Sequence, residues 1–182
     1  MAAKKRSNRR SRPARLKPIP SGFRTVTPYL TISGASEAIE FYKKAFGAKE
    51  LARQTMPDGK ILHARLKIGD SVVMLSDEFP VSDVKSPASL GGTTGTLHIY
   101  SKNIDRIWEQ AISAGAKIVM PLENQFWGER YGTIADPFGH RWSLSMQVKM
   151  SPEEMESKHQ AAMSMFAQGE HPGRTKEDHD IP

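Results

Sequence analysis

The chain alternates apolar and polar residues in short runs from Val26 to Met146, and two runs instead have the spacing of an amphipathic helix. A period of two predicts strands, whereas apolar positions three and four residues apart predict helices. The predicted strands cover residues 26–32, 48–55, 60–68, 70–76, 94–101, 116–122, 130–135 and 140–146. The predicted helices cover residues 34–47, with Ser36 as N-cap and Gly47 at the end, and residues 103–115.

The order strand, helix and three strands occurs twice, and the halves align at a nearly constant offset. Thr27 corresponds to Thr96, and Val72–Ser76 to Arg141–Ser145, each 69 residues further on. Such self-similarity is typical of a duplicated structural unit. We therefore expect an α+β fold of two tandem βαβββ modules, residues 26–77 and 94–147, forming a curved mixed sheet within a domain at residues 23–148.

The stretch "ADPFGHRWSLS", Ala135–Ser145, is unusually polar for the edge of a core strand. Its Asp-Pro-Phe-Gly segment fits a type I turn, in which Asp accepts backbone bonds and Pro fixes φ. Alternation then directs Trp142 and Leu144 into the core and Arg141 and Ser143 to the opposite face. His140 lies at the start of the strand without a ligand partner, so we expect a solvated turn histidine.

Alternation gives the first and fourth strand of each module one apolar and one polar face. The apolar residues should pack against the two helices; they are Leu30, Ile32, Val73, Leu75, Leu97, Ile99, Trp142 and Leu144. The opposite residues carry mostly hydroxyl, phenol, imidazole or guanidinium groups; they are Thr27, Tyr29, Thr31, Val72, Met74, Ser76, Thr96, His98, Tyr100, Arg141, Ser143 and Ser145. We expect this polar face to line a cup that hydrogen-bonds a small polar compound.

The net charge of +6 comes from one end of the chain. Residues 1–17 hold eight of the 26 basic residues and no acid, and the rest has 18 basic against 20 acidic residues. Residues 1–22 are therefore expected to be a basic disordered tail, since they have little apolar surface to bury. Weak, salt-dependent binding of nucleic acid by residues 1–17 is one reading of this tail, and a solubilising leader is the other.

Several classes of protein are excluded by composition. The chain contains no Cys, so it has no disulfide, thiolate metal site or Cys nucleophile. No run of 18 apolar residues predicts a membrane span, and no apolar segment follows the basic N-terminus as in a secretory signal. A cytoplasmic protein is expected.

The segments "FYKKAFGAKE" and "DPFGHRWSL", together with the repeated βαβββ pattern, resemble the vicinal oxygen chelate superfamily of glyoxalases, bleomycin resistance proteins and dioxygenases. Within it the PhnB-like glyoxalase group is most similar. The resemblance implies that two modules enclose a cavity, within one chain or across a homodimer. It also implies four metal-ligand positions, which correspond here to Thr27, Met74, Thr96 and Ser143. Hydroxyl and thioether groups are poor ligands for the usual divalent ions, so we expect neither a metal at this site nor another cofactor.

His98 faces the same way as Thr96 and titrates near neutral pH, so it is the candidate catalytic acid or base. The alternative is a half-buried histidine bonded to a neighbouring carbonyl. The loop 123–132, "ENQFWGERYG", mixes aromatic and charged residues and is expected over the mouth of the cup. The expected ligand-binding residues are Tyr29, Met74, Thr96, Tyr100, Phe126, Trp127, Glu129, Arg130, Arg141 and Ser143. Because Arg130 and Arg141 accompany Glu123 and Glu129, a neutral or anionic ligand is favoured over a cationic drug.

Residues 151–168 predict a C-terminal helix with Ser151 as N-cap and Pro152 at its first position, and residues 169–182 a disordered tail. Three functions remain open. The first is metal-independent binding of a small molecule by a homodimer. The second is a lyase or isomerase of the same superfamily that uses His98, and the third is a nucleic-acid-associated protein that acts through its tail.

Overall fold

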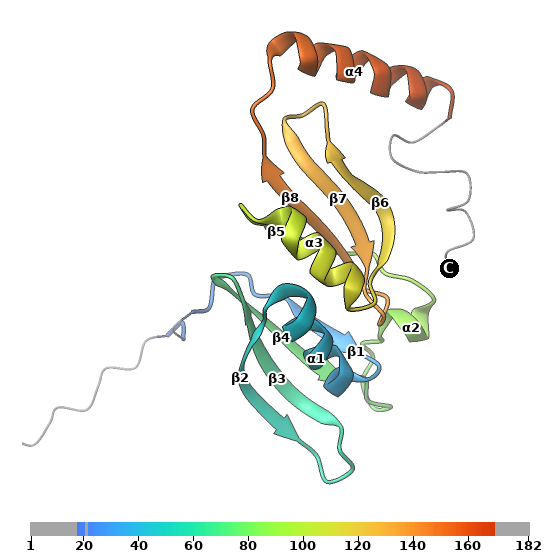
Figure 1. The fold of residues 1–182 in the computed structure, drawn as a ribbon. Helices are drawn as coiled ribbons and strands as arrows, with labels where there is room; N and C mark the ends of the chain where they lie inside the picture. Colours follow the sequence, from blue (N-terminus) through green and yellow to red (C-terminus); the bar gives the residue numbers. More distant parts are fainter. Residues whose placement is uncertain (1–17, 21, 170–182) are drawn as a thin grey trace, which may run out of the picture.

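The computed structural model describes residues 18–20 and 22–169, which form two βαβββ modules, a connector and a last helix (Figure 1). The first module comprises β1 (Tyr29–Ile32), α1 (Ala35–Phe46), β2 (Lys49–Thr55), β3 (Ile61–Ile68) and β4 (Ser71–Asp77). The second comprises β5 (Thr96–Tyr100), α3 (Ile104–Ser113), β6 (Lys117–Asn124), β7 (Glu129–Ala135) and β8 (Arg141–Gln147). The connector contains α2 (Pro87–Leu90), and α4 (Pro152–Ala167) follows β8. The predicted α+β fold with tandem modules is confirmed.

Each module builds its own four-stranded mixed sheet, in the orders β1-β4-β3-β2 and β5-β8-β7-β6. The first strand is parallel to the fourth, and the remaining pairs are antiparallel. Tyr29 pairs with Met74, and His98, 69 residues after Tyr29, pairs with Ser143. The register therefore repeats at the offset found in the sequence.

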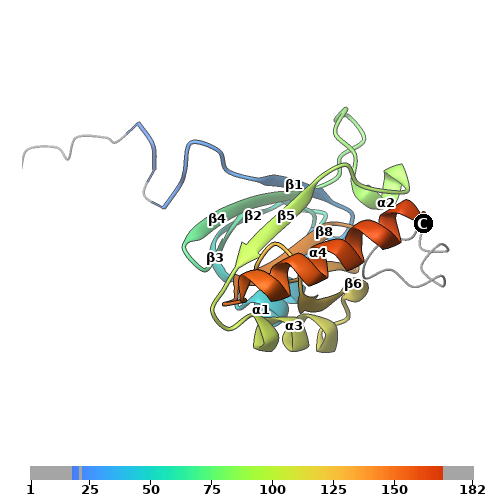
Figure 2. The ribbon, with the colours of Figure 1, turned by 90° about the horizontal axis from the view of Figure 1, so that it is seen from above.

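The helices α1 and α3 lie side by side on one side of the two sheets (Figures 1 and 2). The expected apolar set faces them: Ile32, Leu75 and Leu144 are completely buried, and Leu97 and Ile99 pack against this core while partly exposed. The other face of each sheet therefore carries the polar set. The described residues include no helix long and apolar enough to cross a membrane.

Asp136 in the β7–β8 turn connects the modules. Its carboxylate accepts backbone bonds from Phe138 and His140, as the turn requires. It also accepts hydrogen bonds from the Tyr42 hydroxyl of α1 (2.7 Å) and the Trp142 indole N–H (2.9 Å). The bond from Tyr42 was not foreseen, because no local pattern reveals a partner in the other module.

The expectation of a solvated His140 is wrong, because its side chain is only 7% exposed. Burial lowers the pKa of His140, and the neighbouring Asp136 and a bond to the Thr31 backbone offset only part of this effect. Its Nε2 has no partner among the described residues. The start of β8 thus lies under the first module instead of at an open rim.

Two predicted boundaries are also corrected. The N-cap of α1 is Gly34, not Ser36, and the Asp77 side chain accepts bonds from the Gly34 and Ala35 amides at this end. The first strand begins at Tyr29, three residues later than expected, and the Thr27 hydroxyl donates to the Arg24 carbonyl instead of facing a cup.

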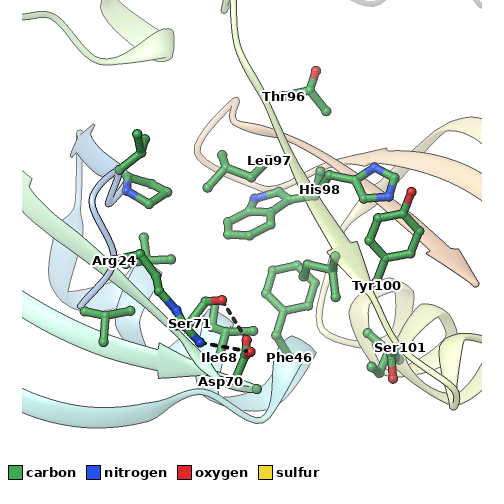
Figure 3. Close-up of a pocket in the computed structure, with 18 residues that line it drawn as sticks. Arg24, Phe46, Ile68, Asp70, Ser71, Thr96, Leu97, His98, Tyr100 and Ser101 are labelled. Carbon is green, nitrogen blue, oxygen red and sulfur yellow. Dashed lines mark hydrogen bonds and ion pairs between the residues drawn. The ribbon is translucent and has the colours of Figure 1, made fainter. Parts of the chain in front are cut away.

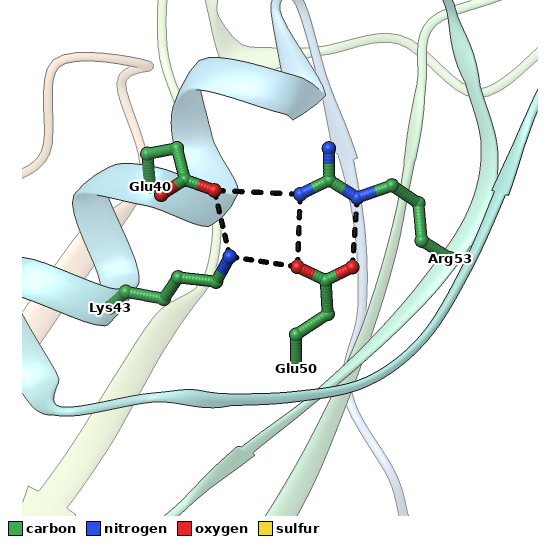
Figure 4. Close-up of polar contacts among 4 residues, drawn as sticks. All are labelled: Glu40, Lys43, Glu50 and Arg53. Atoms are coloured by element: carbon green, nitrogen blue, oxygen red, sulfur yellow. Dashed lines mark hydrogen bonds and ion pairs between the residues drawn. The ribbon is translucent and has the colours of Figure 1, made fainter.

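Four charged side chains join α1 to β2 on the helix side of the first sheet (Figure 4). Lys43 bridges Glu40 and Glu50, and Arg53 contacts the same two carboxylates. Because this network is largely exposed, we attribute little stability to it. It shows that Arg53 points towards the helix.

The last helix begins as predicted, with the Ser151 side chain accepting from the Glu154 amide and Pro152 in the first turn. Only Ala162 of α4 is buried. His159 on this helix lies against Phe126, with ring centroids 5.1 Å apart. The two predicted disordered tails fall mainly outside the described residues.

Candidate functional site

The polar face of the second module carries a connected group of side chains on β5, β7 and β8. The His98 Nδ1 lies 2.6 Å from the Ser143 hydroxyl, which is almost completely buried. The His98 ring lies 4.3 Å from that of Tyr100 and stacks at 6.0 Å on that of Tyr131. The alternative interpretation of His98 was a half-buried histidine bonded to a carbonyl. In the structure His98 is instead bonded to, and oriented by, the hydroxyl of Ser143.

Glu129 is at the centre of this face. Its carboxylate accepts hydrogen bonds from the Tyr100 hydroxyl (2.9 Å), the Trp127 indole (3.2 Å) and the Ser145 hydroxyl (2.8 Å). Burial acts to raise the pKa of Glu129, but the bonds from Ser145, Tyr100 and Trp127 and the nearby His98 together lower it below its ordinary value. The same hydrogen bond raises the pKa of Tyr100. Glu129 is therefore an ionised acceptor held by neutral donors.

The predicted aromatic loop is the turn between β6 and β7. The Trp127 ring meets that of Tyr131 edge-on at 5.5 Å and remains 41% exposed. Phe126 meets Trp127 at 5.0 Å but is also in contact with α4 through His159. Trp127 therefore presents exposed surface next to Glu129, whereas Phe126 packs between Trp127 and α4.

Neither of the two arginines expected beside the cup joins this group. Arg130 follows Glu129 on β7 and so points to the opposite face, where it bonds Asp105 of α3 at 2.6 Å and 2.8 Å. Arg141 begins β8, opposite Thr96, and lines a separate hollow with α2. The structure thus brings His98, Tyr100, Glu129, Trp127 and Ser143 together without either arginine.

The polar face of the first module includes Tyr29 and Met74, which are neighbours in register. The Tyr29 hydroxyl lies 3.2 Å from the His63 Nδ1. Arg65 pairs with Met74 from the other side, and its guanidinium lies 5.9 Å from the centre of the Phe23 ring. His63 and Arg65 are thus functional candidates that were not among the predicted site residues.

A hollow of about 790 Å³ lies between the modules, next to β5 (Figure 3). Phe46, Leu97 and Trp142 line it. Thr96, His98 and Tyr100 line it as well, although their side chains lie on the other side of β5 from Leu97 (Figure 3). An ion pair of Arg24 with Asp70, 3.7 Å long, borders it. Tyr29, Met74 and Ser143 do not line this hollow, so it includes only part of the expected polar cup.

The residues at the four superfamily metal positions do not fit a divalent ion. Thr27 bonds a local carbonyl, Thr96 is exposed at the start of β5, and the Ser143 hydroxyl is committed to His98. Met74 supplies a thioether, which suits soft metals. The described part of the chain also contains no group of three His, Asp or Glu side chains placed to hold a metal.

Tyr131 and Ser145 complete the second face but were not among the predicted ligand-binding residues. The signal was present, because Gly132 and Ile134 are the apolar positions of β7 and therefore assign Tyr131 to the polar side. A Cβ on Gly132 would lie 2.6 Å from Trp108 of α3, which confirms the direction of this strand's faces.

Sequence comparison reveals related proteins in several organisms. The Mycobacterium tuberculosis uncharacterized protein Rv0887c is 45% identical over 148 residues, which cover 79% of this chain and 85% of the relative. The Escherichia coli protein YjdN is 28% identical over 150 residues, which cover 71% of this chain and all but 1% of the relative.

Solved structures share the fold. The Arabidopsis thaliana At5g48480 gene product has a TM-score of 0.57 and 25% identity, covering 68% of this chain and 99% of its own. TioX from Micromonospora sp. ML1 has a TM-score of 0.54 and 27% identity, covering 70% and 100%. The PhnB protein of Bacillus cereus, at 19% identity and a TM-score of 0.51, covers 69% and 100% and is similar in fold alone.

A family model matches residues 25–144, which span nearly all of both modules. The repeated register, the two helices on one side of the sheets and this match agree with one another. The chain belongs to the Glyoxalase/Bleomycin resistance protein/Dioxygenase superfamily.

Proposed function

We propose that the protein binds a small organic molecule on its polar sheet faces, without a metal at the four positions that metal-using superfamily members employ. The observation that carries this proposal is the Glu129 network beside the His98–Ser143 pair. Its donors and acceptors are already oriented by one another, and preorganised groups lose less entropy when a ligand binds. Tyr100 is 65% exposed, so the network is open to a planar molecule that stacks and hydrogen-bonds.

The first face contributes Tyr29 and Met74 to ligand binding. Thr96 and Arg141 contribute from the margin of the second face. A homodimer is part of the proposal, because β1 and β5 are edge strands and Met155 and Met163 on α4 are exposed. Flexible thioethers adapt readily to a partner surface. Light scattering of the purified protein tests this: a mass of twice 20.3 kDa supports the dimer, and 20.3 kDa contradicts it.

The binding proposal is tested in two steps. Elemental analysis of the purified protein comes first, since a stoichiometric metal would contradict the metal-free site. A screen of small aromatic and polar compounds then monitors the Trp127 indole N–H by NMR. Compounds that shift this signal should bind Glu129→Gln and Tyr100→Phe more weakly, by about tenfold for one lost charge-assisted bond. Arg130→Gln, on the opposite face, is the matched control and should bind normally.

An enzyme of the lyase or isomerase type is the second candidate, favoured by the orientation of the His98 ring by Ser143. For any compound that binds, His98→Ala separates the two functions. Loss of turnover with retained affinity supports catalysis, whereas a loss of affinity without any turnover supports binding alone. The third candidate rests on residues 1–17, which lie outside the described residues. Removal of these residues abolishes function only if the tail carries it.

A further inference from the structure

We propose that Arg65, on the polar face of the first module, binds an oxyanion group of the ligand, a carboxylate or a phosphate. The Nε of Arg65 is buried from solvent and has no hydrogen-bond partner in the described part of the chain. A buried N–H of a charged group without a partner is uncommon and calls for an explanation, of which a bound ion is one.

The surroundings hold the guanidinium in place without neutralising it. The Phe23 ring lies 5.9 Å from its Cζ on one side, and Met74 and Ala52 are its register neighbours on β4 and β2. None of these side chains carries an oxygen or nitrogen acceptor. Arg65 therefore differs from Arg24, Arg53 and Arg130, each of which faces a carboxylate.

The rest of this face is basic or neutral. Gln54, His63, Lys67 and Met74 share the face of Arg65 by register, and none is a carboxylate. The acids of the neighbouring strands β2 and β4 are engaged elsewhere: Glu50 points to α1, and Asp77 holds the start of that helix. Asp70, in the β3–β4 turn, is paired with Arg24. An incoming anion thus meets a positive group with no competing negative charge from these strands.

The chemistry of the guanidinium defines the ligand class. Its planar N–H groups match two oxygens of a carboxylate or phosphate, and the aromatic side chain beside it shields the bond from water. Tyr29 and His63, which lie within 3.2 Å of each other, supply further polar contacts on the same face. This inference rests on the proposed function, because the oxyanion is one part of the molecule that the polar faces hold. It replaces Arg130 by Arg65 as the reason to expect an anionic ligand.

The test uses the complete, ¹⁵N-labelled protein and follows the Nε–H signal of Arg65, identified by its loss in Arg65→Lys. Burial protects this proton from exchange and makes its signal observable. Inorganic phosphate and acetate are titrated separately at constant ionic strength, with sodium chloride as balance. The expected result is a saturable shift of this signal with both anions. No saturable shift with either anion would overturn the proposal.

Matched variants identify the residue responsible. Signals of Tyr29 and His63 report anion binding in the variants. Arg65→Met should lower the affinity for the anion at least about tenfold. Arg65→Lys keeps the charge without the planar fork and should give an intermediate loss. Arg53→Met removes an arginine from the helix side and should leave binding unchanged. Equal binding by Arg65→Met in a folded protein would contradict the assignment.

The outcome is separable from that of the proposed function. The Trp127 indole signal reports the second face, and the Arg65 signal reports the first. A response of Trp127 to neutral compounds, with Arg65 indifferent to phosphate and acetate, retains the proposed function and removes this inference. A response of the Arg65 signal to both anions, with no response of the Trp127 signal to any compound, removes the proposed binding at the second face and retains the anion site at Arg65.

Discussion

Removal of the Asp136 carboxylate should destabilise the whole domain, because this side chain connects its two modules. In Asp136→Ala, the Tyr42 hydroxyl and the Trp142 indole lose their acceptor, and both residues are at most 1% exposed. Each buried donor left without a partner costs about 1–3 kcal/mol. With the two backbone bonds of the turn partly replaced by water, the loss should be about 3–6 kcal/mol. A typical domain has only about 5–15 kcal/mol of stability in total.

Two milder variants grade this effect. Tyr42→Phe removes one bond to a charged group and should cost about 1.5–3 kcal/mol. Asp136→Asn places an amide where the carboxylate stood. The Tyr42 hydroxyl can turn to accept from that amide, whereas the indole N–H can only donate. The expected order of stability is therefore wild type, Tyr42→Phe and Asp136→Asn, then Asp136→Ala.

Equilibrium unfolding in urea, followed by circular dichroism and tryptophan fluorescence, measures these differences. The matched control is Asp58→Ala in the exposed β2–β3 turn, where the carboxylate accepts only the Lys60 amide, and its cost should stay below about 1 kcal/mol. The double variant Tyr42→Phe/Asp136→Ala should be little worse than Asp136→Ala, since its second change removes an already unpaired hydroxyl. Additive losses, or a loss below that of the control, would refute the bridging role.

Three further predictions follow from individual contacts. Because burial lowers the pKa of His140 below 6.5, the unfolded chain binds more protons than the folded one, and the free energy of unfolding should fall as the pH drops through 6.5, by at most about 1.4 kcal/mol per pH unit. His140→Gln should reduce this slope, which urea titrations at several pH values measure. Gly132→Ala should lower the free energy of unfolding by about 1–3 kcal/mol in the same assay, because its Cβ would lie 2.6 Å from Trp108. Gly92→Ala, which has open space around it, should leave the stability unchanged, and equal losses in the two variants would contradict the close approach at Gly132. Glu129→Gln should lower the raised pKa of Tyr100 towards 10.0, visible in an ultraviolet titration compared with Tyr100→Phe; an unchanged titration would contradict the Tyr100–Glu129 bond.

The modules were predictable from sequence because each rests on local signals. Alternation in "VVMLS" and "RWSLS", and Gly47 at the end of a helix, depend on neighbours within a few residues. The N-cap of α1 was missed because its acceptor, Asp77, lies 42 residues away. His140 was misjudged for the same reason, since it bonds to the backbone of Thr31, in the other module.

The candidate site was predicted less well than the fold. His98 and Ser143 were found on one face because both strands alternate clearly. Arg130 was misplaced because it was assigned to the loop 123–132 over the cup as well as to the start of a strand, whereas β7 already begins at Glu129 and directs Arg130 to the opposite face. Arg65 was overlooked because no sequence pattern shows that a guanidinium lacks a partner.

The bond between Tyr42 and Asp136 joins residues 94 positions apart, and this has a consequence during synthesis of the chain. At about 5–20 residues per second, a ribosome needs roughly 5 to 20 s to add that stretch. Throughout this interval the nascent first half presents Tyr42 and Phe46 without the Trp142 ring that later packs on them. The emerging chain should therefore expose apolar surface that chaperones recognise until its second half arrives, and a ribosome stalled before residue 136 should leave it open to proteolysis.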